Sequence, residues 1–446
     1  MKVMIVSAWR DRYAGDERAR AFPSLSAVHL AALCPAHVEV QVWHDQIRAL
    51  DPDRVDVDLV AITSTTGSSG RMYELSDRLR EKGVKVILGG PHVSLVSHES
   101  LAHADAVAIG YGEVSFPEML RDFELGRLQK VYHQPEALSL AGLPVPRYDL
   151  MEDEFLFRCF VQATRGCPFT CSFCTLKALD EGFRIRPVHE VIRDILACDG
   201  RNWLQRKMVW FWDDNLTASA SYARELFTQL RPLRKWWWAQ CSIEAADDRE
   251  LLRLAARSGC LAVFVGVETF SEENLIRVRK KQNKVERYRA AVKAFHSAGI
   301  AVHAGLVVGL DGDTDASLRR IPGAVRELGI DLAFVNLLTP FPGTPVRSQL
   351  ASAGRLCGSG WDRHHGAAVT FVPQWMTVDE LEQAYWDVHH QLYATGQTLR
   401  RVLRSARNVS ASGFALNAYV NALFWIQNLL RPDHPWMDGA SHANNR

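Results

Sequence analysis

The chain has 446 residues, with 52 Lys and Arg against 51 Asp and Glu, for a formal net charge of +1. This length allows two or three domains with large cores, and the balanced charge without a basic block argues against nucleic-acid or anionic-membrane partners. No apolar run reaches membrane-span length and no export signal precedes the first strand pattern, so we expect a cytoplasmic protein with reduced cysteines.

Strand-like and helix-like patterns alternate over the first 135 residues. Apolar runs that predict strands lie at 2–7, 38–42, 59–62, 84–88 and 106–109, with helical patterns at 24–33 and 71–82. The alternation predicts a doubly wound, Rossmann-like α/β domain over residues 1–135 with a parallel sheet. We expect its ligand to lie beyond the carboxyl ends of the strands.

A proline-containing linker, 136–158, leads to a second unit over 159–350. Its predicted strands are 160–164, 208–212, 238–243, 262–267, 301–308 and 334–338, with helical patterns between them. Six such repeats predict a partial (β/α)6 barrel of the TIM type, with its chemistry at the carboxyl ends of the strands. Residues 351–446 are predicted to form a mainly helical C-terminal domain.

Three cysteines follow the first strand of this second unit with the spacing C-x3-C-x2-C. They are Cys167, Cys171 and Cys174. Three thiolates on one loop can each hold one corner of a [4Fe–4S] cluster, which leaves the fourth iron open for a substrate or cosubstrate. A three-cysteine zinc site and unrelated buried thiols are the alternatives, but a zinc site needs a fourth ligand and the loop has no His.

This loop resembles that of the radical S-adenosylmethionine (SAM) enzymes. The resemblance implies that the open iron binds the amino and carboxylate groups of SAM. It also implies that one electron, from a donor such as flavodoxin or ferredoxin, cleaves SAM to methionine and a 5′-deoxyadenosyl radical. That radical then takes a hydrogen atom from a small-molecule substrate.

The second strand of the predicted barrel ends at Asp213 and Asp214. In the family this position holds the amino group of SAM, so the resemblance implies that one of these carboxylates does so here. The alternative is that the Asp-Asp-Asn sequence caps a helix, since both residue types are good N-caps.

Two later strand ends extend the resemblance. Glu268 ends the fourth strand, where the family binds the ribose of SAM, and Val308, Gly309 and Leu310 end the fifth, where it contacts the adenine. Each of these motifs is weak alone. Their order after the three-cysteine loop makes the resemblance specific over most of the chain.

Further polar residues on the barrel strands predict a polar cavity rather than an apolar one. We assign Gln240 and Ser242 to the cofactor, and Glu244 and His303 to general acid–base roles. For any one of them the alternative is an ordinary hydrogen-bonded core or turn group. Several tryptophans, Trp212 among them, are candidates for stacking on a sugar, with core packing as the alternative.

The first domain resembles the cobalamin-binding domain that is fused to many radical SAM enzymes. The resemblance lies in Gly89-Gly90-Pro91-His92 and in the segment 105–113. Where the family's B12 enzymes with a His ligand carry D-x-H-x-x-G, this chain has 10–15 without a histidine, and Arg10 and Arg12 crowd the loop. These departures predict that any bound cobalamin lacks a protein His ligand, and they leave cobalamin a possible but doubtful cofactor.

Three functions fit these motifs. The first is radical dehydration of a polar small molecule, an amino sugar or aminoglycoside of secondary metabolism, as in the apramycin-pathway radical SAM dehydratases, followed by a separate NADPH-dependent reductase. The second is cobalamin-dependent radical C-methylation, and the third is a non-catalytic iron–sulfur redox or binding protein. The crowded first loop and the short segment after the barrel favour dehydration.

Overall fold

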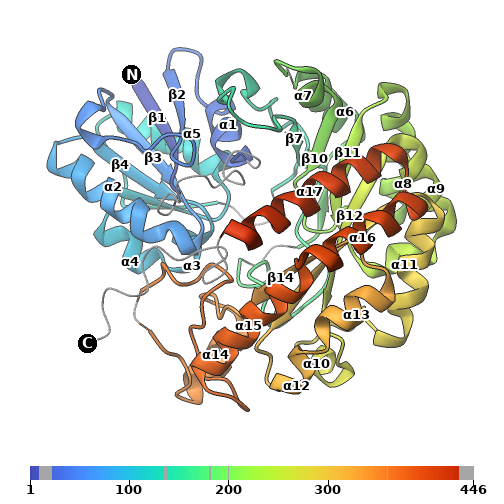
Figure 1. The fold of residues 1–446 in the computed structure, drawn as a ribbon. Helices are drawn as coiled ribbons and strands as arrows, with labels where there is room; N and C mark the ends of the chain where they lie inside the picture. Colours follow the sequence, from blue (N-terminus) through green and yellow to red (C-terminus); the bar gives the residue numbers. More distant parts are fainter. Residues whose placement is uncertain (10–22, 135–137, 180–181, 199, 359, 431–446) are drawn as a thin grey trace.

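Two parallel sheets, each flanked by helices, organise the protein (Figure 1). The structure, a computed structural model, describes all residues except 10–22, 135–137, 180–181, 199, 359 and 431–446. The N-terminal sheet and its helices form one unit, and the second sheet with its surrounding helices forms a larger one beside it. The α/β fold class expected from the sequence is confirmed.

The N-terminal sheet has six parallel strands in the order β2-β1-β3-β4-β5-β6. Its strands are β1 (Lys2–Ser7), β2 (Glu39–His44), β3 (Leu59–Thr63), β4 (Lys85–Gly89), β5 (Ala106–Ile109) and β6 (Val131–His133). Its helices are α1 (Leu25–Ala32), α2 (Ser69–Glu81), α3 (Pro91–Leu95), α4 (Ser97–Ala102) and α5 (Gly112–Glu124). The short edge strand β6 has no counterpart in the predicted elements, since three residues carry too little pattern to be recognised.

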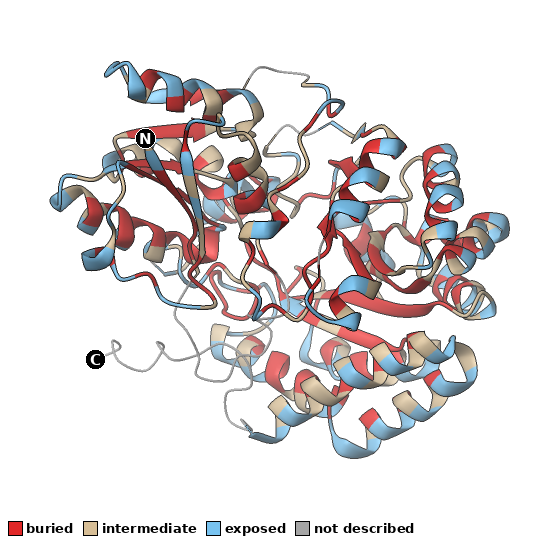
Figure 2. Ribbon diagram, turned by 90° about the horizontal axis from the view of Figure 1, so that it is seen from above, coloured by how far each residue is buried: buried red, intermediate tan, exposed pale blue. Residues whose placement is uncertain are grey.

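Helices cover both faces of this sheet, so its strands are apolar on both faces. Val6, Val60 and Leu88 belong to the core on one face, while Ile5 and Ile87 belong to the core on the other. Figure 2 shows the same pattern, with buried strands between helices whose outer sides are exposed. Because these strands are buried on both faces, they appear in the sequence as short runs of apolar residues, and this pattern predicted them.

The second sheet is also parallel, in the order β14-β13-β12-β11-β10-β7. Its strands are β7 (Phe160–Val161), β10 (Met208–Phe211), β11 (Trp236–Cys241), β12 (Cys260–Glu268), β13 (Ala301–Val308) and β14 (Leu332–Leu337). The intervening helices are α6 (Val188–Ala197), α7 (Trp203–Lys207), α8 (Ala220–Leu230), α9 (Arg249–Ser258), α10 (Glu272–Arg277), α11 (Tyr288–Ser297), α12 (Asp315–Leu318) and α13 (Ile321–Leu328). Six strands that do not close on themselves leave a partial barrel with an open side.

The two faces of the barrel sheet have separate cores. Phe211 and Trp237 belong to the larger core with the surrounding helices, whereas Trp210 and Trp238 belong to a second, aromatic cluster. Trp210 and Trp238 contact each other at a centroid distance of 4.8 Å. This aromatic cluster marks the inner face of the sheet, because neighbouring residues of a strand point to opposite faces.

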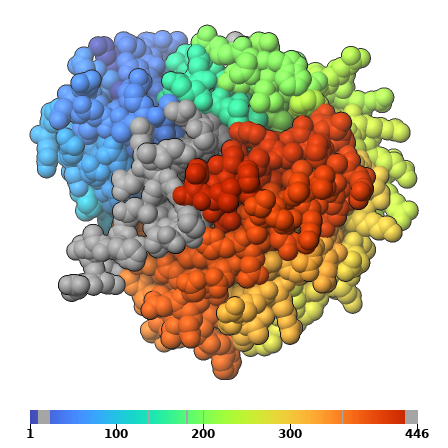
Figure 3. Space-filling model, viewed as in Figure 1, coloured from blue at the N-terminus to red at the C-terminus, as the bar shows by residue number. Residues whose placement is uncertain are grey.

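The C-terminal helices are α14 (Pro345–Ser352), α15 (Val378–Leu392), α16 (Thr395–Asn408) and α17 (Ala411–Leu430). α17 contacts β13 and β14, where Asn417 lies 3.2 Å from His303 and Phe424 packs against Phe334. Figure 3 shows the C-terminal helices, in orange and red, over one face of the molecule. Within the described residues, no helix is long and apolar enough to cross a membrane.

Candidate functional site

The three-cysteine loop lies between two short strands, β8 (Thr164–Arg165) and β9 (Arg184–Ile185), which pair with each other. Two backbone hydrogen bonds at Ser172, between the second and third cysteines, connect the loop to neighbouring segments. The Ser172 N–H donates to the Val278 carbonyl, and the Val346 N–H donates to the Ser172 carbonyl. The loop is therefore held in place before any cofactor binds.

Amide donors face two of the thiols. The Asn215 side-chain N–H2 lies 4.0 Å from Cys167 Sγ, and that of Gln282 lies 3.9 Å from Cys171 Sγ. Burial raises the pKa of Cys171, and it raises that of Cys174 to about 12. Coordination removes the thiol proton, and amide donors stabilise the negative sulfur that results.

The donor set fits an iron–sulfur cluster better than a single metal ion. Among the residues that the structure describes, no three His, Cys, Asp or Glu side chains gather around one point where a single ion could bind. A zinc site needs that convergence, whereas the ligands of a cube bind separate corners.

A cavity of about 110 Å³, the cofactor cavity, opens beside the cysteine loop at the carboxyl ends of β10, β11 and β12. Its walls include Cys167, Asp214, Asn215, Gln240, Ser242, Phe264, Gly266, Glu268, Lys280, Gln282 and Asn283. The side-chain oxygens of Gln282 and Asn283 are buried there without a hydrogen-bond partner. Such acceptors fit a ligand that brings hydroxyl and amino donors, as SAM does.

Glu268 and Lys280 form a buried ion pair in this cavity, with Oε1 and Nζ 2.7 Å apart. Burial alone lowers the pKa of Lys280, but the negative charges of Glu268 and Cys171 outweigh it and raise the pKa. Glu268 has a left-handed backbone (φ 64°), an uncommon conformation for this residue type. Strained positions of this kind cluster at binding sites, where the surrounding structure maintains them.

The two neighbouring aspartates of β10 have different environments. Asp213 is fully buried and accepts hydrogen bonds from the backbone N–H groups of Ala163 and Thr164 and from the Thr164 hydroxyl. Burial raises its pKa to about 7. Asp214 accepts one hydrogen bond, at 3.0 Å from the Gly166 N–H, and lines the cofactor cavity. Neither caps a helix, since α8 begins after Ser219.

The adenine segment expected at the end of β13 does not line the cofactor cavity. Its backbone N–H groups at Gly309 and Leu310 both donate to Asp313 at 2.9 Å. Gly309 has φ 90°, and a Cβ there would lie 2.9 Å from Leu381 of α15. In this structure the missing side chain makes room for the C-terminal helices.

Glu244 and His303 line neither this cavity nor the interdomain cavity described next. Glu244 is exposed on a 3₁₀ turn, Ile243–Asp247, after β11. His303 is buried on the inner face of the sheet, between the Trp238 Nε1–H and the Asn417 side chain. Burial lowers the pKa of His303 to about 4, so it is neutral at physiological pH. This geometry offers no support for their acid–base roles.

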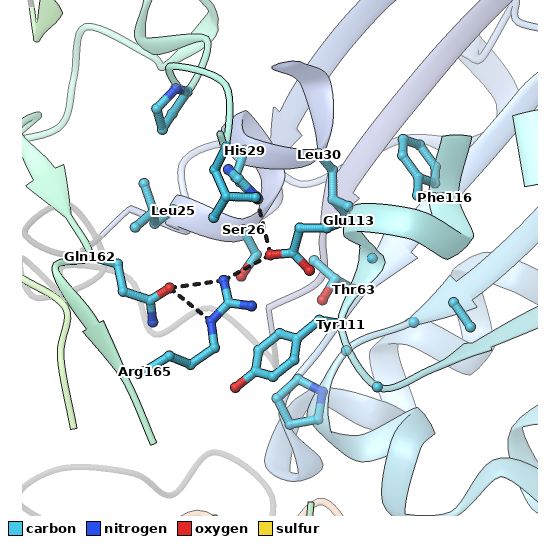
Figure 4. Close-up of a pocket in the computed structure, with 18 of the residues that line it drawn as sticks. Leu25, Ser26, His29, Leu30, Thr63, Tyr111, Glu113, Phe116, Gln162 and Arg165 are labelled. Carbon is cyan, nitrogen blue, oxygen red and sulfur yellow. Dashed lines mark hydrogen bonds and ion pairs between the residues drawn. The ribbon is translucent and has the colours of Figure 1, made fainter. Parts of the chain in front are cut away.

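A second cavity, of about 220 Å³, lies between the two units and is called here the interdomain cavity (Figure 4). One wall consists of the carboxyl ends of β3, β4 and β5 with the loops that follow them, including Thr63, Gly90 and Gly110. Gly90 and Gly110 both have positive φ, and a Cβ at Gly90 would collide with the Thr63 hydroxyl. The opposite wall comes from the barrel, with Gln162 and Trp212.

Arg165 crosses this cavity and joins the two units. Its guanidinium donates to Glu113 at 2.8 Å and to Gln162 at 3.0 and 3.1 Å, and it stacks 3.8 Å from the centre of the Tyr111 ring. Glu113 is also 3.3 Å from His29, as Figure 4 shows. Burial alone would raise the pKa of Glu113, but His29 and Arg165 hold it at about 2. The residue two places before Cys167 is thus bound to the N-terminal unit.

Comparison with known proteins matches each unit separately. Residues 161–321 match the model of the radical SAM superfamily, and residues 16–120 match that of the B12 binding domain. The two units of the chain therefore resemble, in order, a B12-binding domain and a radical SAM domain. Residues 344–430 match a third model, a domain of unknown function named DUF4070.

The chain is also similar to known proteins over most of its own length. The chain is 26% identical to the bacteriochlorophyllide d C-12(1)-methyltransferase of Chlorobaculum tepidum, over 90% of this chain and 89% of that protein. It is also 26% identical to the hopanoid C-2 methylase of Rhodopseudomonas palustris, over 76% of this chain and 66% of that protein. The radical SAM methyltransferase TsrM from Kitasatospora setae, solved with cobalamin and a [4Fe–4S] cluster, has a similar fold, with a TM-score of 0.68. The two proteins are 16% identical, and the match covers 95% of this chain and 98% of TsrM.

These findings correct two expectations. Radical dehydration of an amino sugar is wrong as the main function, because the three similar proteins described above are methyltransferases or methylases. The acid–base pair and the downstream reductase, which belonged to that reaction, lose their basis with it. The doubt about cobalamin is also overturned by the match to the B12 binding domain. That doubt arose mainly from residues 10–15, which lie outside the described residues.

Several residues that build the site were missed from the sequence. Lys280, Gln282 and Asn283 lie in a loop after α10, and Arg165 and Glu113 belong to different domains. The position of Arg165, a basic residue just before the cysteine loop, could have indicated a functional role from the sequence. Nothing local marks Glu113 as its partner.

Proposed function

We propose that this chain is a cobalamin-dependent radical SAM methyltransferase that methylates a carbon atom of a small molecule. The observation that carries the proposal is the meeting of two cavities at β10. Trp212 lines the interdomain cavity, and Asp214, two residues later, lines the cofactor cavity. The carboxyl ends of the two parallel sheets therefore line neighbouring cavities, as a reaction that uses two cofactors requires.

When bound, a cluster with SAM supplies a hydrogen-abstracting radical, and cobalamin supplies a methyl group. In this proposal Cys167, Cys171 and Cys174 hold the cluster, and the N–H groups of Asn215 and Gln282 stabilise two of the sulfurs. The loops after β3, β4 and β5 hold the cobalamin. The glycines there leave room for a large ring system.

The cofactor cavity provides the SAM contacts. Asp214 is the carboxylate assigned to the amino group, since Asp213 is already saturated by backbone donors. Glu268 is assigned to the ribose hydroxyls and is oriented by Lys280. Gln240 and Ser242 complete the wall. Val308, Gly309 and Leu310 are retained as adenine contacts only through the family resemblance, since they lie outside the cavity.

The test is anaerobic reconstitution with iron, sulfide and cobalamin, followed by turnover with SAM that carries a deuterated methyl group and a chemical reductant. The expected products are 5′-deoxyadenosine and S-adenosylhomocysteine, with the labelled methyl group on the bound cobalamin. Formation of 5′-deoxyadenosine without cobalamin binding or methyl transfer would contradict the proposal. Absence of any SAM cleavage would instead favour the non-catalytic iron–sulfur protein.

A further inference from the structure

The strip of wall between the two cavities lies on the inner face of the barrel sheet. Trp210 pairs with Trp238, and because side chains alternate between faces, Trp212 and Gln240, two residues further along, lie on the same face as this pair. Gln240 in turn pairs with Phe264. We call these three residues, Trp212, Gln240 and Phe264, the inner band. Trp212 lines the interdomain cavity, whereas Gln240 and Phe264 line the cofactor cavity.

The inner band exposes aromatic surface where the sheet is concave. Trp212 is 41% exposed, although Trp210, two residues earlier on the same face, is buried. Phe160 packs against Trp212 edge to face, with centroids 5.4 Å apart, and Phe264 contacts Phe334 at 5.6 Å. Large aromatic rings held rigidly by other rings and exposed in a concavity are typical of ligand contacts.

The inner band carries no charge, and the nearby carboxylates are engaged. Glu113 is paired with Arg165, Glu268 with Lys280, and Asp194, which lines the interdomain cavity, with Arg186. Of the described cavity-lining carboxylates, this leaves Asp214, which the proposed function assigns to the cosubstrate. A cationic amino sugar would find no carboxylate of its own on this wall, and burying an uncompensated ammonium group costs several kcal/mol.

We infer that the substrate presents a flat aromatic or conjugated ring, which lies against Trp212 and Phe264 while the Gln240 amide binds a polar group on its edge. This inference rests on the proposed function, because that function requires the substrate to lie within reach of both cavities. It replaces the sugar-stacking role that the sequence suggested for the tryptophans. The uncharged inner band favours substrates with a flat ring, and the Gln240 amide fixes the orientation of that ring.

The test measures binding to the reconstituted protein, with cobalamin and SAM present and no reductant added, by equilibrium dialysis. The probes are tryptophan as a small ring, chlorophyllide a as a large one, and the aminoglycoside kanamycin as the polar comparison. We expect at least one ring probe to bind and kanamycin not to bind. Trp212→Ala should weaken the ring probe about tenfold or more, while Trp212→Phe should keep most of the affinity.

Trp203→Ala is the matched control, since Trp203 is 59% exposed on α7 and lines neither cavity. It should leave binding within about twofold of the unchanged protein, a difference well under 1 kcal/mol. Failure of both ring probes to bind, tighter binding of kanamycin, or equal effects of Trp212→Ala and Trp203→Ala would each overturn the inference. Because no methyl transfer is measured, ring binding in a protein that fails the labelled-methyl test would refute the proposed function and uphold the inference.

Discussion

Replacing Glu113 by Gln tests the connection between the two domains. The carboxylate is buried and lies 2.8 Å from Arg165 and 3.3 Å from His29. Glutamine has nearly the same shape but no charge, so the variant leaves the Arg165 guanidinium buried without its counter-ion. Removing one partner of a buried pair is more damaging than removing both, because the remaining charge stays desolvated.

The size of the effect follows from the pKa of Glu113. The native environment lowers it from 4.5 to about 2, and this difference corresponds to about 3 kcal/mol of preferential stabilisation of the carboxylate. The expected loss in free energy of unfolding for Glu113→Gln is therefore ~3 kcal/mol at pH 7. Since Arg165 and Glu113 both line the interdomain cavity, where cobalamin is proposed to bind, we also expect weaker cobalamin retention.

Urea unfolding of the reconstituted protein under anaerobic conditions measures the first quantity, and cobalamin absorbance after gel filtration measures the second. Glu273→Gln is the matched control, because the Glu273–Arg277 pair is exposed on α10 and contributes ~0.5 kcal/mol or less. An unfolding free energy for Glu113→Gln within ~0.5 kcal/mol of the control would refute the argument that this pair holds the domains together.

The remaining predictions concern pH, the cluster, SAM and the C-terminal helices. Because folding lowers the pKa of Glu113, the ionised carboxylate contributes its full stabilising free energy above about pH 4.5, and this free energy is lost as the pH falls toward about 2. The stability of Glu113→Gln should therefore show no such decrease over this pH range. Cys171→Ala should abolish both iron–sulfur absorption and 5′-deoxyadenosine formation, while Cys357→Ala, outside the loop, should keep both. Lys280→Met should raise the Kd of SAM about tenfold in calorimetry by releasing Glu268, with the exposed Lys281→Met unchanged. Gly309→Ala should lower the free energy of unfolding by about 1–2 kcal/mol more than Gly354→Ala. Both glycines have positive φ, but only a Cβ at Gly309 would contact packed side chains. Equal losses of stability in the two variants would contradict this prediction.

Local pattern accounts for what the sequence predicted correctly. Parallel strands buried on both faces appear as short apolar runs, so the α/β class was recognisable, and an edge strand of three residues was not. Cysteine spacing identified the loop because all three thiols lie within one short segment. The reaction was predicted wrongly because the crowded first loop, residues 10–15, and the short segment after the barrel were given more weight than the N-terminal domain as a whole.

Contacts between distant segments were decided only by the tertiary structure. Asp213 and Asp214 are adjacent and of the same residue type, but after β10 ends Asp213 accepts hydrogen bonds from the backbone while Asp214 lines a cavity. Arg165 and Glu113 are 52 residues apart, and their pairing depends on how the two domains pack. The exposure of Trp212 likewise depends on the packing of the two domains, because this side chain lines the cavity between them. The sequence determined which cofactor chemistry is available, and the packing of the domains determined which residues face the space between the two cavities.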